Sequence, residues 1–118
     1  MQRVYDLEER LIDFAVTICA VTRSLPRNRV ANHIAGQLIR CGTAPAPNYA
    51  ESQSAESRRD FVHKMKICLQ ELRETNVWLR LIRRLGWDAA PEMMDAVRES
   101  NELISIFVRS LETARRNR

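Results

Sequence analysis

Apolar residues recur three and four positions apart along most of the chain, which is the spacing of one face of an α-helix. The first series predicts a helix that ends near residues 24–26, with the stripe Val4, Leu7, Leu11, Phe14, Ile18, Val21 and Leu25. The middle of this segment, residues 11–21, is apolar nearly all round. Because one bundle core needs only one stripe, the pattern predicts a second buried surface on this helix.

The second helix is predicted to begin after Asn28, a residue type that favours the N-cap position. Pro45 and Pro47 then require a kink or a break, because a straight continuation would cost about 3 kcal/mol or more at each proline. The polar residues 51–57 are expected to end this element and to form a loop. The expected core positions are Val30, Ile34, Leu38 and Cys41.

The third helix has the clearest pattern, and Gly86 is its expected C-terminal cap. Its core stripe is an uninterrupted four-three repeat of Phe61, Met65, Cys68, Leu72, Thr75, Leu79 and Ile82. A second stripe beside it predicts that this helix, too, is contacted from two sides. That stripe comprises Ile67, Glu71, Glu74, Trp78, Leu81 and Leu85.

A fourth helix is predicted to open at Pro91, a favourable first-turn residue. Its stripe runs through Met93, Val97, Ser100, Ile104, Phe107, Leu111 and Ala114. The short connection from the third helix favours antiparallel neighbours. The sequence therefore predicts a single all-α domain over residues 1–118, an up-down-up-down four-helix bundle whose second helix is kinked or broken near Pro45 and Pro47.

The charge of the 118-residue chain is unevenly spread. The chain has nineteen Lys and Arg residues and fifteen Asp and Glu residues, and the whole excess of four basic residues lies after residue 57. A polyanionic partner would therefore meet the second half of the chain. The alternative is an Arg-rich surface that water solvates. The candidate nucleic-acid-binding residues are Arg59, Lys66, Arg73 and Arg80, which recur every seven residues, with Arg83, Arg84, Arg115 and Arg116.

Two carboxylates one helical turn apart, Glu71 and Glu74, could serve acid-base chemistry or hold a cation. We favour a structural role, because each lies within a turn of Arg73, Arg80 or Lys64 and acids inside an apolar stripe more often fix register. Arg73 and Arg80 could then be neutralised by ion pairs with Glu71 and Glu74, or with acids of a neighbouring subunit.

Other catalytic and metal-binding patterns are not found. His33 and His63 have no Cys, His or carboxylate at the spacing of a helical metal pair, and Cys19, Cys41 and Cys68 stand far apart. We interpret these cysteines as reduced core residues and expect no metal, no cofactor and no enzymatic activity. A signal peptide and a membrane-spanning segment are not evident, which favours a cytoplasmic location with no membrane partner.

Three ordered segments resemble the family of four-helix-bundle proteins encoded in intervening sequences of 23S ribosomal RNA genes, which is similar to the accessory protein of diversity-generating retroelements. The resemblance extends from about residue 8 to residue 116. The segments are RCGT at 40–43 with NYAE at 48–51; DFVHKMKI at 60–67 with ELRET at 71–75 and WLRLI at 78–82; and ELISIF at 102–107 with SLETAR at 110–115. Two prolines replace small or aliphatic residues of the first segment.

The resemblance implies a four-helix bundle that forms a pentameric ring with a basic surface for nucleic acid or a reverse transcriptase, and it implies no known enzymatic activity. We therefore expect a non-enzymatic homo-oligomeric adaptor that binds structured RNA or DNA, or a nucleic-acid enzyme. The alternative is a protein-binding scaffold with no nucleic-acid role. The expected oligomer interface comprises Ile12, Val16, Ile67, Glu74, Trp78, Leu81 and Leu85.

Overall fold

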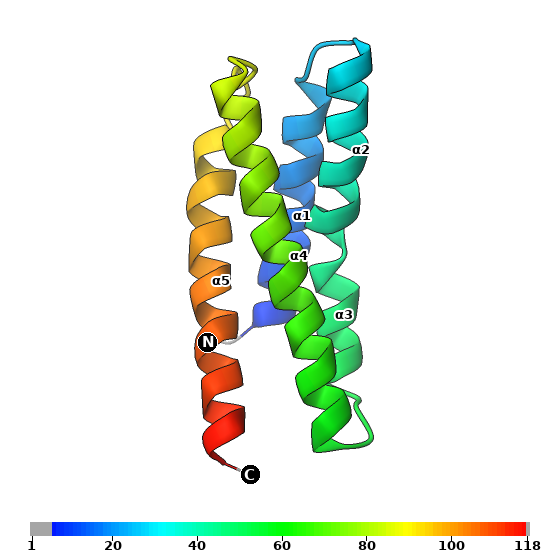
Figure 1. Cartoon of the computed structure of the whole chain (residues 1–118), viewed down its shortest axis with the longest axis vertical. Helices are drawn as coiled ribbons and strands as arrows, with labels where there is room; N and C mark the ends of the chain where they lie inside the picture. Colours follow the sequence, from blue (N-terminus) through cyan, green and yellow to red (C-terminus); the bar gives the residue numbers. More distant parts are fainter. Residues whose placement is uncertain (1–5, 118) are drawn as a thin grey trace.

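The chain runs up and down the long axis of the molecule in a computed structural model that describes residues 6–117, whose regular structure is entirely α-helical. In Figure 1, α1 (Leu7–Arg23) runs upward, α2 (Arg29–Thr43) and α3 (Pro45–Ser52) run downward, α4 (Arg58–Arg84) returns upward, and α5 (Met93–Arg116) descends. The two pieces α2 and α3 together form one bent helix. The prediction of an all-α, up-down-up-down four-helix bundle is therefore confirmed.

Side-chain caps fix where three of these helices begin. Asp6 Oδ1 accepts a hydrogen bond from the amide of Glu9 at 3.2 Å, and Asn28 Oδ1 accepts one from the amide of Ala31 at 2.8 Å. Ser57 caps α4 in the same way. Each cap satisfies an amide that has no partner inside its helix and contributes about 1 kcal/mol. The predicted start after Asn28 is confirmed.

The second helix bends at Pro45 without unravelling. Ala44, between α2 and α3, keeps helical backbone angles (φ −67°, ψ −34°). Pro45 occupies the first position of α3, where a missing N–H does not break a helical hydrogen bond of that segment. The proline ring nevertheless prevents a straight passage from α2 into α3. The predicted kink is confirmed.

Gly86 ends α4 as expected. Its φ of +79° lies in the left-handed region, which a residue with a Cβ rarely adopts. The amide of Trp87 donates to the carbonyl of Ile82 at 3.1 Å, and the amide of Gly86 donates to the carbonyl of Arg83 at 3.0 Å. This pair of bonds is the Schellman motif, which satisfies the last carbonyls of the helix.

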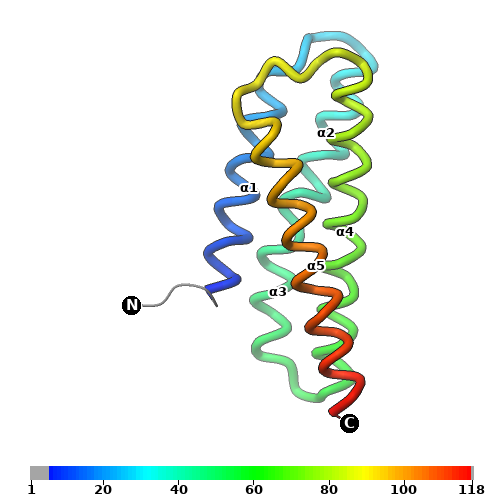
Figure 2. The backbone as a smooth tube through the Cα atoms, turned by 90° about the vertical axis from the view of Figure 1, so that its left-hand side faces the viewer, coloured from blue at the N-terminus to red at the C-terminus, as the bar shows by residue number. Residues whose placement is uncertain are grey.

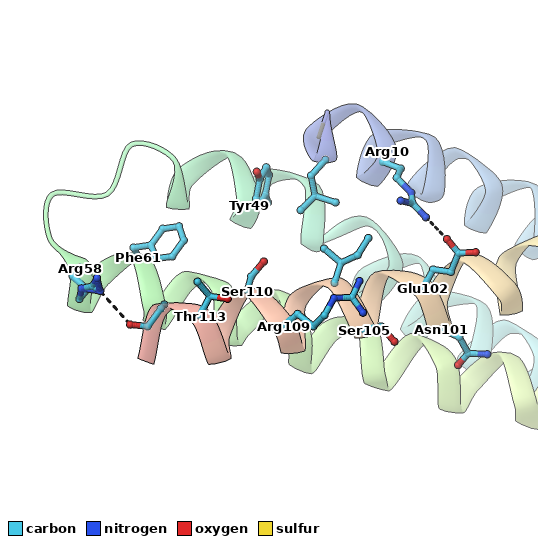
Figure 3. A pocket seen from close by; sticks show the side chains of 13 residues that line it. Arg10, Tyr49, Arg58, Phe61, Asn101, Glu102, Ser105, Arg109, Ser110 and Thr113 are labelled. Atoms are coloured by element: carbon cyan, nitrogen blue, oxygen red, sulfur yellow. Dashed lines mark hydrogen bonds and ion pairs between the residues drawn. The ribbon is translucent and has the colours of Figure 1, made fainter. Parts of the chain in front are cut away.

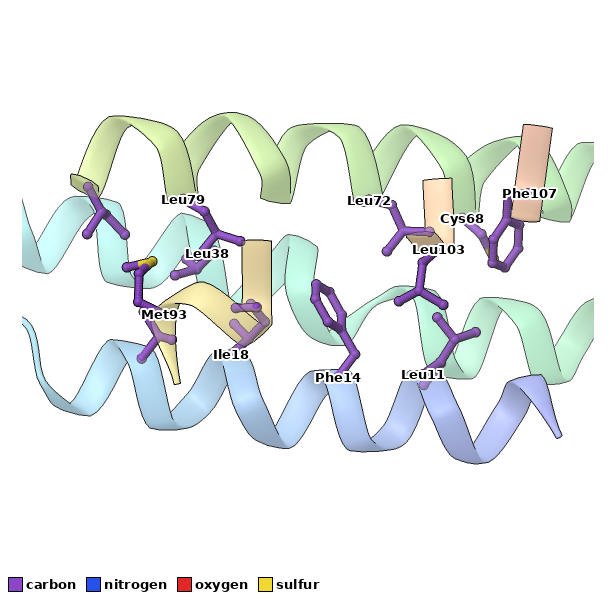
Figure 4. Packing of buried hydrophobic residues seen from close by; sticks show 14 of the residues in the cluster. Leu11, Phe14, Ile18, Leu38, Cys68, Leu72, Leu79, Met93, Leu103 and Phe107 are labelled. Atoms are coloured by element: carbon purple, nitrogen blue, oxygen red, sulfur yellow. The ribbon is translucent and has the colours of Figure 1, made fainter. Parts of the chain in front are cut away.

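The predicted stripes meet along the axis of the bundle (Figure 4). On α1, Leu11, Phe14 and Ile18 are at most 1% exposed. The last six members of the α4 stripe, Met65 to Ile82, are all buried, which confirms this part of the prediction, whereas Phe61 at its start is half-buried. On α5, Ala96 and Leu103 are buried, and the predicted members Val97 and Ile104 are only half-buried. Val4, the first predicted member of the α1 stripe, lies outside the described residues.

Two expectations about helix ends were wrong. Val30 is 54% exposed, and Ala31 faces the core in its place. Positions three and four before Ile34 both fit helical spacing, so periodicity did not separate them. The last helix begins at Met93 rather than at Pro91, because the amide of Met93 donates to the carbonyl of Ala90 and closes a turn first. Within residues 6–117, no helix combines the length and the apolar character needed to cross a membrane.

Candidate functional site

The four residues Arg59, Lys66, Arg73 and Arg80, here called the basic ridge, are all exposed along α4. Steps of seven residues place their Cα atoms about 10 Å apart along the helix axis. Within residues 6–117, none of the four has a carboxylate partner, and Arg80 donates from Nε to Asn76 Oδ1 at 3.0 Å. The predicted solvent-facing row is confirmed, and its positive charge is not neutralised inside the described part of the chain.

The two carboxylates that could have neutralised the ridge, Glu71 and Glu74, bind a different arginine. Arg40 of α2 donates from Nη1 to Glu71 Oε1 at 3.1 Å and from Nη2 to the carboxylate of Glu74. Trp78 Nε1 also donates to Glu74, at 3.1 Å. These acids therefore have the structural role that we favour from the sequence, but their partner is Arg40 and not Arg73, Arg80 or Lys64.

The choice of Arg40 as the partner of these acids has a geometric cause. Glu71 and Glu74 lie on the side of α4 that packs against α2, so a cation from the neighbouring helix reaches them. Lys64 instead pairs with Glu51 of α3, at 2.6 Å. Partial desolvation lowers the pKa of Arg40, but the attraction of Glu74 and Glu71 outweighs this effect and raises it. Arg40 therefore stays charged, and both carboxylates are engaged in a structural contact between helices.

The structure divides the remaining predicted cations between the two ends of the molecule. Arg83 and Arg84 lie at the upper end of α4, whereas Arg115 and Arg116 lie at the lower end of α5 (Figure 1). At this lower end, Arg58 donates to the carbonyls of Ala114 (3.2 Å) and Asn117 (2.9 Å), so α4 begins where α5 ends. The basic ridge spans the length between the two groups, so the eight candidates extend from one end of the molecule to the other.

Three arginines that sequence reasoning missed join the upper group. Arg23, Arg27 and Arg29 are exposed around the connection from α1 to α2, at the same end of the bundle as Arg83 and Arg84 (Figure 1). We call these five residues the end cluster. The signal was local: residues 23–29 contain three arginines and no acid, although the first half of the chain is neutral overall.

The predicted oligomer interface separates into two apolar surfaces. Ile12 and Val16 of α1 are 40% and 60% exposed, and Leu81 and Leu85 of α4 are 38% and 42% exposed. Helices α1 and α4 occupy diagonal corners of the bundle and are not backbone neighbours, so their outer surfaces face different directions. The other three predicted interface residues, Ile67, Glu74 and Trp78, are half-buried.

Part of the second stripe on α4 is covered by α2 within the same chain. His33 meets the ring of Trp78 edge-on, with 6.2 Å between the ring centroids. Arg40 lies level with Glu71 and Glu74, so the antiparallel α2 brings the exposed Val30 near the upper part of this stripe. The apolar surface around Leu81 and Leu85 therefore includes a residue of α2.

Chemically reactive groups do not gather in the described structure. Among residues 6–117, no three His, Cys, Asp or Glu side chains lie close enough together to hold a metal ion. Burial raises the pKa of Cys41 to about 11 and that of Cys68 to about 12, so both remain protonated thiols at neutral pH.

Comparison with known proteins agrees with the fold and with the resemblance. The model of the 23S rRNA-intervening sequence protein family matches residues 5–109. The chain belongs to this family. A crystal structure of a protein of unknown function from the S23 ribosomal protein family of Bacteroides thetaiotaomicron VPI-5482 is 26% identical, with a TM-score of 0.76 over 88% of this chain and 96% of that one. No curated protein matches the chain. Family membership thus fixes the four-helix fold and leaves the role of its surfaces to physical argument.

Proposed function

We propose that this protein of the 23S rRNA-intervening sequence family is a non-enzymatic, homo-oligomeric adaptor, and that it forms the pentameric ring that the family resemblance implies. Its basic surface binds structured RNA or DNA, or a nucleic-acid enzyme such as a reverse transcriptase. The observation that carries this proposal is the basic ridge, whose four cations have no carboxylate partner within residues 6–117. Glu71 and Glu74, the acids nearest to Arg73 in sequence, are held by Arg40.

Unneutralised cations favour a phosphate backbone because each phosphate that they neutralise releases a condensed counterion. One such contact adds little binding affinity in a chain with a formal charge of +4. An oligomer presents several copies of the same ridge, and linked contacts raise the overall affinity well above that of one subunit. Oligomerisation and nucleic-acid binding therefore support each other in this proposal.

The nucleic-acid part is tested with Arg73→Glu combined with Arg80→Glu. Filter binding of a structured RNA and of duplex DNA at two salt concentrations should show at least a tenfold loss of affinity, and salt should weaken the wild-type complex. Arg98→Glu, an exposed single charge reversal on α5, is compared with the single variant Arg73→Glu, which changes the net charge by the same amount. Circular dichroism should show that all variants remain folded, because exposed positions carry little packing energy.

A second variant pair separates the ridge from the end cluster. If Arg27→Glu with Arg29→Glu abolishes binding while the ridge variant binds like wild type, the nucleic-acid role survives and the ridge assignment is wrong. If the wild-type protein binds neither nucleic acid at low salt, the protein-binding scaffold with no nucleic-acid role is favoured instead.

The oligomeric part rests on the two apolar surfaces that face different directions. Two non-equivalent surfaces fit a head-to-tail contact, in which α1 of one copy packs on α4 of the next, and such contacts form a ring when the rotation between copies closes. Val16→Glu should remove one surface and Leu81→Glu the other, so each variant alone should sediment as a 13.7 kDa monomer.

Mixing the two variants gives the decisive result. Val16→Glu retains an intact α4 surface, and Leu81→Glu retains an intact α1 surface. One molecule of each variant should therefore associate into a species of twice the 13.7 kDa chain mass. A wild-type protein that stays at 13.7 kDa at high micromolar concentration would refute the oligomer.

A further inference from the structure

An open groove lies along the lower half of the bundle, between α5 on one side and α3 with the first turn of α1 on the other (Figure 3). Its volume is about 1470 Å³. Phe61 of α4 lines its lower part, and Tyr49 of α3 and Ile106 of α5 line opposite walls. The groove belongs to neither the basic ridge nor the two apolar surfaces described above.

Among residues 6–117, no helix occupies the fourth corner of the bundle at the level of the groove. Arg10 of α1 binds Glu99 and Glu102 of α5, so the antiparallel α1 begins level with about residue 105 of α5. Helix α5 continues to Arg116, whereas α1 begins part-way along the molecule (Figure 2). Helices α3 and α5 lie at diagonal corners of the bundle, and they meet through side chains, because the ring of Tyr49 packs edge-on against that of Phe107 with 6.0 Å between the ring centroids.

The walls of the groove suit a helix rather than a small molecule. The vacant length beside α5 corresponds to about eleven helical residues, or about 16 Å. Leu7, Tyr49, Phe61 and Ile106 are only half-buried, so they leave apolar surface along the groove. The α5 wall also contains Ser110, whose small side chain permits close approach of another helix. The volume exceeds the usual range for small ligands, about 300–1,000 Å³.

The charges that line the groove favour an acidic occupant. The lining contains three arginines, Arg10, Arg58 and Arg109, and one carboxylate, Glu102. Arg10 already binds Glu102, at 2.6 Å, and Glu99, at 2.7 Å. Within residues 6–117, Arg58 and Arg109 have no carboxylate partner, although Arg58 donates to the last carbonyls of α5. Two positive charges in the lower groove therefore remain available.

We propose that the groove binds an acidic amphipathic helix of a partner protein, which completes the fourth helix of the bundle below α1. The apolar stripe of that helix packs on Tyr49, Phe61 and Ile106, as an amphipathic helix does in other hydrophobic grooves. Its carboxylates meet Arg109 and Arg58. The proposal does not depend on nucleic-acid binding or on the oligomeric state.

The probe is a fluorescent synthetic peptide of about 14 residues, with leucine at the a and d heptad positions and glutamate at the flanking positions. Fluorescence anisotropy should show saturable binding to the full chain. The same peptide with lysine in place of glutamate should bind at least tenfold more weakly, because it repels Arg58 and Arg109. Equal affinity of the two peptides, or no binding of the acidic one, would overturn the proposal.

Three variants locate the binding site. Arg109→Glu should weaken binding of the acidic peptide at least tenfold, and Ser110→Trp should abolish it by filling the groove. Arg98→Glu makes the same charge change as Arg109→Glu on the same helix but outside the groove, and should bind like wild type. Circular dichroism and urea unfolding verify that each variant is folded. Unchanged binding by folded Ser110→Trp or Arg109→Glu would refute this site.

Discussion

Two sides of α4 contain ionisable residues, acids on one side and cations on the other, and they differ in what the rest of the chain does to them. On the side that faces α2, Glu71 and Glu74 bind Arg40, and Trp78 contacts both Glu74 and His33. On the outward side, the cations of the basic ridge are exposed, and no carboxylate within residues 6–117 pairs with them. One helix therefore has a neutralised, half-buried side and a charged, open side.

This difference shows that distance along a helix is a poor guide to which charges pair. Arg73 lies between Glu71 and Glu74 in sequence, yet both acids bind an arginine more than thirty residues away. The side chain of Arg73 projects from a different side of the helix, because neighbouring residues are about 100° apart around the axis. A positive row persists on α4 because α2 supplies the cation for its acids.

The largest expected effect comes from the third side of α4, which faces the core. Leu72→Ala should lower the free energy of unfolding by about 2–5 kcal/mol, because Leu72 is completely buried midway along the stripe. Urea unfolding measures the loss. The matched control is Arg73→Ala at the next position, which should change stability by less than about 0.5 kcal/mol. Similar losses in the two variants would show that the sides of α4 are wrongly assigned.

A smaller effect should distinguish the two charged sides. Arg40→Gln should lower the urea midpoint, because it leaves Glu71 and Glu74 without their shared cation. Arg73→Gln removes a charge with no carboxylate partner in the described chain and should leave the midpoint unchanged. High salt should shrink the effect of Arg40→Gln, since it screens exposed ion pairs. Equal effects at low salt would contradict the contrast between the two sides.

The smallest effect concerns the thiols. Cys68 on the core side of α4 and Cys41 on α2 are buried, whereas Cys19 on α1 is partly exposed. A thiol reagent at pH 8 should therefore modify Cys19 first and the other two only after unfolding. Cys19→Ala should remove the fast-reacting thiol. Rapid reaction of all three thiols in the folded protein would contradict the burial of Cys41 and Cys68.

The same thiols should make the protein slightly less stable in alkali. Burial raises the pKa of Cys41 from 9.0 to about 11 and that of Cys68 from 9.0 to about 12. Above pH 9 the unfolded chain therefore loses these protons before the folded one does, and stability falls as pH rises. Urea midpoints between pH 8 and pH 10 measure the fall, which should be smaller in Cys68→Ala.

Most of the fold could be predicted from the sequence, and the site only in part. Periodicity identified the buried stripe of α4, Asn28 and Gly86 marked helix ends, and Pro45 marked the bend. The exposed basic ridge followed from the same helical phase. The end cluster was missed because its arginines come from two connections that are distant in the sequence and meet at one end of the bundle.

The sequence by itself determined which face of each helix is apolar, because that property depends only on residues within about two helical turns. Tertiary structure alone decided that Arg40 neutralises Glu71 and Glu74, that Ala31 rather than Val30 enters the core, and that the late start of α1 leaves a groove beside α5. These outcomes depend on the rotation and relative height of neighbouring helices. Packing of the whole bundle sets this rotation and this height, and no local pattern of residues determines them.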